Sequence, residues 1–93
     1  MPSRTVAVAS ASGLHARPAA LFVKAAKAQP VAVTIRTGEK KPVPAGSMLH
    51  VLSLGAGHGA EVTLEAEGEG AEEALDVLAA MLVTDLDATA DHG

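Results

Sequence analysis

The chain of 93 residues lacks cysteine, tryptophan and tyrosine, and Phe22 is its only phenylalanine. Without cysteine it can form neither disulfide bonds nor thiolate metal sites. No apolar stretch reaches the length of a membrane span, and the opening residues Met1–Arg4 lack the apolar core of a signal peptide. We therefore expect a cytoplasmic protein with no membrane insertion, and the length predicts one domain, residues 1–93.

Basic residues are missing from the second half of the chain. All seven lysines and arginines lie in the first 50 residues, opposed there only by Glu39, whereas the last 43 residues carry ten acidic residues. The net charge is −4 and the basic set is small, which argues against nucleic acid as a partner. Arg17, Lys24 and Lys27 would suit an acidic protein or a phosphate group if one helix displays them outward. The alternative is a merely solvated face.

A seven-residue motif near the N-terminus concentrates polar chemistry: Gly13, Leu14, His15, Ala16, Arg17, Pro18 and Ala19. Pro18 has no N–H and fits only the first turn of a helix, so a helix should begin near residue 16. With His15 at the cap position, the amides of Ala16 and Arg17 point out of the helix end, where the dipole attracts anions. The motif therefore predicts a phosphate site formed by Ala16 and Arg17. The same field favours a neutral, nucleophilic His15 ring.

Hydrophobic periodicity predicts seven elements and an α+β fold. Three segments alternate apolar and polar residues as half-buried strands do, and a fourth contains two prolines and belongs at a sheet edge. Three helices are predicted with them, and each of the two longer ones has one apolar face. In chain order the segments are Thr5–Ala9, a helix 16–28, Val31–Thr37, Lys41–Pro44, a short helix 47–55, Ala60–Ala66 and a helix from Ala71. One sheet face stays wet, so the helices should cover the other; the tail from about residue 84 should fray.

The short helix near residue 50 carries more apolar residues than one buried stripe can hold. We expect Ser47 to cap it and Gly55 to end it. Exposed apolar clusters often mark interfaces, so Met48, Leu49 and Leu52 are candidates for a partner-docking patch, with ordinary core positions as the alternative.

Taken together, these residues resemble the HPr family, the histidine phosphocarriers of the phosphoenolpyruvate-dependent sugar phosphotransferase system. The seven-residue motif is similar to that family's active-site string. A second block, Ser47–Gly55, resembles the family's second short helix, and Gly59–Val62 resembles the start of its last strand. The resemblance spans nearly the whole chain.

The resemblance implies a fold, a function and a set of roles. The fold is an open-faced β-sandwich, a four-stranded antiparallel sheet of order 1-4-2-3 with three helices on one face. His15 would carry a phosphoryl group on Nδ1, steadied by Arg17, taken from phosphorylated enzyme I and passed to IIA domains of sugar transporters. Ser47 aligns with a serine that a regulatory kinase phosphorylates in some members. The docking residues are Arg17, Ala20, Lys24, Lys27, Met48, Leu49 and Leu52. We expect a monomer.

The motifs of several enzyme classes are missing from the sequence. It has no Walker-type loop, no carboxylate pair beside His15 and no metal-ligand cluster, so we expect no metal, no cofactor and no hydrolytic activity. The chain is predicted to be a transiently phosphorylated carrier rather than an enzyme. His50, His58 and His92 are interpreted as bystanders, although His50 lies close to the docking patch and could tune partner choice.

Two other hypotheses stay open at this point. One is a regulatory binding module of the same fold that acts through the Ser47 surface, and its partner binding would survive His15→Ala. The other is a small-molecule-sensing domain, for which the sequence holds no pocket signature; a ligand that raises thermal stability would support it.

Overall fold

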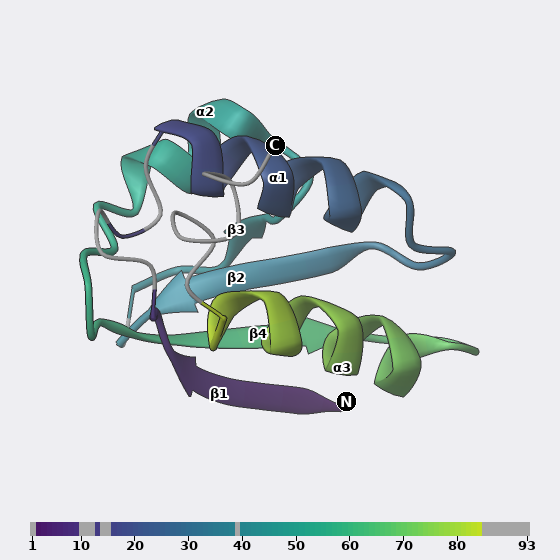
Figure 1. Ribbon diagram of the computed structural model, residues 1–93. Helices are drawn as coiled ribbons and strands as arrows, with labels where there is room; N and C mark the ends of the chain where they lie inside the picture. Colours follow the sequence, from purple (N-terminus) through teal and green to yellow (C-terminus); the bar gives the residue numbers. More distant parts are fainter. Residues whose placement is uncertain (1, 10–12, 14–15, 39, 85–93) are drawn as a thin grey trace.

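The structure, a computed structural model, describes residues 2–9, 13, 16–38 and 40–84. Within these residues the chain forms four strands and three helices in the predicted order (Figure 1). The elements are β1 (Ser3–Ala7), α1 (Ala16–Lys27), β2 (Val33–Thr37), β3 (Val43–Pro44), α2 (Met48–Ser53), β4 (Glu61–Ala66) and α3 (Ala71–Leu82).

The strands form one sheet in the order β1-β4-β2-β3, and every neighbouring pair is antiparallel. β4 is central: Leu64 pairs with Arg4 of β1 on one side and with Ile35 of β2 on the other. The predicted α+β fold and the strand order 1-4-2-3 are therefore confirmed. The other sheet face is polar, with the Thr5 and Thr63 hydroxyls 3.0 Å apart.

The core lies between the helices and one face of the sheet. On β2 and β4 the buried residues alternate along the strand, as Val33 and Ile35 and as Val62, Leu64 and Ala66 do. The helices contribute the stripes that their periodicity predicts, and every predicted inward position is buried: Ala19, Phe22, Val23, Ala26, Ala71, Ala74, Leu75, Leu78 and Leu82. Packing of these stripes orients α1 and α3 and fixes which of their faces reach solvent.

The bounds of two strands differ from those that the sequence predicts. β1 covers Ser3–Ala7 rather than Thr5–Ala9, because its backbone pairs with β4 as far as Ser3 opposite Glu65. The amide of Ala9 leaves the sheet and donates to the carbonyl of Leu82 at 2.8 Å. β2 begins at Val33 rather than Val31, since Val33 pairs with Ala66, where β4 ends.

The remaining boundaries agree with the predictions to within a few residues. β3 is a two-residue edge strand, as its prolines require. Across the residues that the structure describes, no helix is long and apolar enough to cross a bilayer. The predicted fraying of the tail concerns residues 85–93, which lie outside the described part of the chain.

Candidate functional site

The start of α1 has the character that the N-terminal motif predicts. The helix begins at Ala16, and Pro18 lies buried in its first turn, where its missing N–H costs no hydrogen bond. The first turn contains no acidic residue, so no carboxylate of its own complements the positive helix end. His15 and Leu14 lie outside the described residues, and the predicted role of the ring stays a prediction.

The outer face of α1 carries the basic residues of the predicted docking surface. Arg17, Ala20, Lys24 and Lys27 are all exposed. Lys24 and Lys27 lie in the last turn, where a cation also stabilises the negative end of the helix dipole. The face is thus open to an acidic partner, and its two lysines have a structural role as well.

The apolar residues of α2 divide between core and surface. Leu49 is 77% exposed and Leu52 is 37% exposed, whereas Val51 is fully buried. Met48 is half-buried and packs against the core, so it is a weaker docking candidate than Leu49. α2 packs beside α1 in the helical layer (Figure 1), and their exposed residues therefore lie on neighbouring elements.

Ser47 occupies the N-cap position of α2, but its side chain does not cap the helix as predicted. Its backbone is extended, and its hydroxyl makes no hydrogen bond to the helix amides. Instead Oγ lies 2.8 Å from Nδ1 of His50, one turn further on. The Ser47 hydroxyl thus contacts an imidazole of the same helix and no helix amide. The serine–histidine spacing of three residues on a helix was the signal for this contact.

Gly13, two positions before His15 in the sequence, is locked against the turn that precedes β4. It is buried with φ of +74°, a left-handed conformation that favours glycine. A Cβ atom there would lie 2.5 Å from the carbonyl oxygen of Ala56 and 2.6 Å from Cα of Gly57. Only glycine permits so close an approach of two backbone segments, and sequence reasoning assigned Gly13 no such contact.

Backbone hydrogen bonds hold the end of β1 beside the same turn. Val8 donates to Ala60 at 2.9 Å and accepts from the amide of Gly59 at 2.8 Å. Ala9 is bonded to Leu82, the last residue of α3. The end of β1, the end of α3, Gly13 and the α2–β4 loop thus lie together at one end of the domain. The start of α1 lies on the same, left-hand side of Figure 1.

Metal binding finds no support among the described residues, since none of their His, Asp and Glu side chains form a group of three able to hold an ion. The described polar side chains at this end include Arg17 and His58, both exposed. A guanidinium and an imidazole N–H donate hydrogen bonds, which suit an anion rather than a cation.

Comparison with known families shows to which family the chain belongs. A family model described as the PTS HPr component phosphorylation site matches residues 2–84. The chain belongs to the HPr family. The match covers nearly all of the residues described above and includes the N-terminal motif.

Individual HPr proteins agree with this assignment. Phosphocarrier protein HPr of Streptomyces coelicolor is 51% identical over 87 residues, with 94% of each chain covered. A crystal structure of HPr from Bacillus anthracis superposes with a TM-score of 0.82 at 41% identity, covering 87% of this chain and 95% of that one. Crh, a Bacillus subtilis catabolite-repression protein crystallised as a domain-swapped dimer, gives a TM-score of 0.68 at 43% identity, covering 88% and 93%.

Proposed function

We propose that this chain is a phosphocarrier that takes a phosphoryl group onto His15 from phosphorylated enzyme I and passes it to IIA domains of sugar transporters. One observation carries the proposal: the family model named for the phosphorylation site spans the motif at which α1 begins. The first turn of α1, which lacks acidic residues, adds independent physical support.

The chemistry needs only one nucleophile on this chain. The lone pair of Nδ1 of His15 attacks phosphorus in line, a new P–N bond forms and the P–N bond to the donor's imidazole breaks. The donor leaves as neutral imidazole, and the proton on Nε2 of His15 stays in place. Transfer to the acceptor repeats the same exchange, so the chain ends each cycle unchanged and acts as a carrier rather than an enzyme.

The neighbours of His15 would hold the charge of the phosphoryl group. Amides at the start of α1, those of Ala16 and Arg17 in our assignment, donate to its oxygens in the field of the helix dipole. The guanidinium of Arg17, on the exposed face of the first turn, adds a charge-assisted hydrogen bond. Moderate stabilisation suits a carrier, since a tightly held group could not be passed on.

The docking surface for both partners is proposed on α1 and α2. Its cations are Arg17, Lys24 and Lys27, which complement an acidic partner. Exposed apolar side chains of Leu49 and Leu52 lie on the adjacent helix and would be buried on association.

The experiment that tests the function supplies labelled phosphoenolpyruvate and cognate enzyme I, then maps the labelled residue. We expect acid-labile, base-stable phosphate on His15 and none on the variant His15→Ala. His50→Ala is a matched control, because it removes an exposed imidazole from α2 and should still be labelled. Label on any residue other than His15 would overturn the assignment.

A second candidate function is regulatory binding through the Ser47 surface. The observation that favours it is the contact of Ser47 with His50, which turns the hydroxyl away from the helix amides. A phosphate on Ser47 would add about −2 charge and repel an acidic partner. This reading requires that partner binding survive His15→Ala and fail in Ser47→Asp.

We also propose that the chain is a monomer and is located in the cytoplasm. β1 pairs with β4 of its own chain over five residue pairs, so the fold needs no strand from a second copy. Light scattering should give the mass of one 9.3 kDa chain, and a particle of twice that mass would instead indicate an exchange of the kind described for Crh.

A further inference from the structure

His58 stands at the apex of a tight turn between α2 and β4. The amide of Ala60 donates to the carbonyl of Gly57 at 3.0 Å, which makes His58 the second residue of a four-residue turn. Gly59, the third residue, has φ of +82°, as a type II turn requires. The imidazole is exposed, and the backbone that carries it is fixed by hydrogen bonds.

This turn is attached to both sides of the segment that leads to His15. Gly59 and Ala60 are hydrogen-bonded to Val8, before that segment, and the backbone of Gly57 packs on Gly13, after it. Gly13 precedes His15 by two positions in the sequence. The turn that carries His58 therefore lies against the chain two positions before His15.

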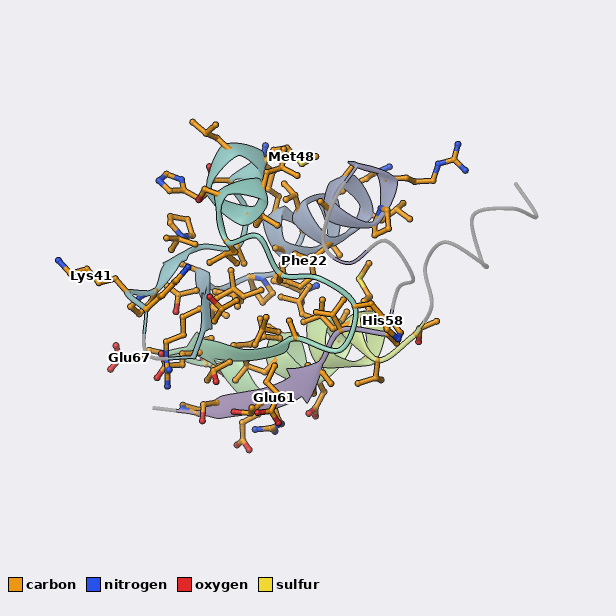
Figure 2. The ribbon with its side chains drawn as sticks, turned by 90° about the vertical axis from the view of Figure 1, so that its left-hand side faces the viewer. Phe22, Lys41, Met48, His58, Glu61 and Glu67 are labelled. Carbon is orange, nitrogen blue, oxygen red and sulfur yellow. The ribbon has the colours of Figure 1, made fainter. Side chains whose placement is uncertain are left out.

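Figure 2 shows where His58 lies relative to the helices. Figure 2 shows it on the right, between the first turn of α1 and the last turn of α3, while Lys41 lies on the opposite side of the molecule. The start of α1 and the end of α3 both lie toward the left-hand side of Figure 1.

We propose that His58 is a second phosphate-binding side chain, which donates a hydrogen bond to the phosphoryl group on His15. The inference rests on the proposed function and changes the interpretation of His58 as a bystander. No bond is made or broken at His58: its ring N–H donates to a phosphoryl oxygen, and the P–N chemistry stays with His15. The contact exists only in the phosphorylated protein, so it favours that form over the free one.

A competition experiment measures this preference. Equal amounts of the original chain and His58→Ala share a limiting supply of phosphoryl groups through a trace of enzyme I, and mass spectrometry counts the phosphorylated fraction of each. We expect the original chain to hold the phosphoryl group about threefold to fivefold more often, as one exposed charge-assisted contact allows. His58→Lys supplies another hydrogen-bond donor at this position and should restore nearly equal sharing.

The matched control is Lys41→Ala, which removes an exposed cation from the opposite side of the molecule and should share equally. In nuclear magnetic resonance spectra, the ring nitrogens of His58 should shift when His15 is phosphorylated. Equal sharing by His58→Ala, or unchanged His58 nitrogens, overturns the role of His58 and leaves the phosphocarrier function intact. If neither protein is phosphorylated on His15, the proposed function itself fails.

Discussion

α1 and α3 perform the same structural task with opposite charges. Both are twelve residues long, and both bury one stripe of small and apolar side chains against the sheet. The first turn of α3 contains Glu72 and Glu73, whereas the first turn of α1 contains no acidic residue. α3 therefore complements its own positive end with two carboxylates, whereas the first turn of α1 supplies none.

The two helices also differ along their length, since α1 carries arginine and lysine and no acidic residue, and α3 carries acidic residues and no lysine or arginine. α3 is tied to the sheet by Arg4 of β1, whose guanidinium lies 3.0 Å from Asp76 and 3.8 Å from Glu72. Among the residues that the structure describes, the cations on the exposed face of α1 have no acidic residue on their own helix. Packing alone would not distinguish the two helices, whereas their charges do.

The largest expected effect is on stability, and it should be equal for both helices. Phe22 of α1 and Leu78 of α3 are fully buried, so replacing either with alanine should lower the free energy of unfolding by about 2–5 kcal/mol. Urea denaturation measures the loss. Leu49→Ala on α2 is the control, since a side chain that is 77% exposed should cost less than about 0.5 kcal/mol. A stable Phe22→Ala variant would contradict the packing described.

Substitutions on α1 and α3 should differ in their effect on the rate of phosphoryl transfer, and Arg17→Ala on α1 should have the larger effect. Loss of a guanidinium that holds the phosphoryl charge should slow transfer from enzyme I by about 10- to 100-fold, while the urea midpoint stays unchanged because the side chain is exposed. Stopped-flow transfer kinetics give the rate. The matched variant on α3 is Glu73→Ala, which should transfer at the original rate. Normal transfer by Arg17→Ala would mean that backbone amides suffice.

Reversing the charge of the α1 surface should weaken docking. For Lys24→Glu combined with Lys27→Glu, we expect KM for the carrier in the enzyme I reaction to rise by about tenfold with kcat little changed, and the rise to shrink in high salt. Glu73→Lys, which adds a cation to α3 instead, serves as the control and should leave KM within about twofold. Equal effects on both helices would indicate non-specific steering by net charge.

The smallest effect is expected for the contacts that tie α3 to β1. Arg4 is partly exposed and its acidic partners are mostly exposed, so Arg4→Ala should lower the free energy of unfolding by no more than about 1 kcal/mol. Thermal unfolding at two salt concentrations checks this, because a surface ion pair weakens in salt. A decrease of more than about 2 kcal/mol in the free energy of unfolding would show that these ion pairs are needed to hold α3 on the sheet.

The sequence predicts the elements well where burial leaves a periodic pattern. Every inward position expected on α1 and α3 is buried, because a helix that covers one sheet face must repeat apolar residues at helical spacing. The predicted start of β1, Thr5, lies two residues after the observed start, Ser3. Ser3 and Arg4 pair with β4 through their backbone, and their side chains show no alternating strand pattern. Backbone pairing of a polar edge segment is decided by its partner, not by its own sequence.

The surroundings of the site could be predicted only in part. The helix start at Ala16 follows from Pro18, because proline restricts where a helix can begin. The lock of Gly13 onto Ala56 and Gly57 joins residues more than forty positions apart and leaves no local signal. The contact between Ser47 and His50 likewise depends on side-chain rotamers, which the sequence does not show. The sequence therefore predicts that Ser47 caps the helix amides, and the structure shows no such hydrogen bond.

The most direct measurement is a nitrogen–proton correlation spectrum of the chain before and after phosphorylation by phosphoenolpyruvate and enzyme I. The largest amide shifts should fall at His15, Ala16 and Arg17, with the phosphorus resonance that of a phosphohistidine, and the amides of α3 from Ala71 to Leu82 should barely move. Largest shifts on α3, or a phosphorus resonance of a phosphoserine, would contradict an anion site at the start of α1.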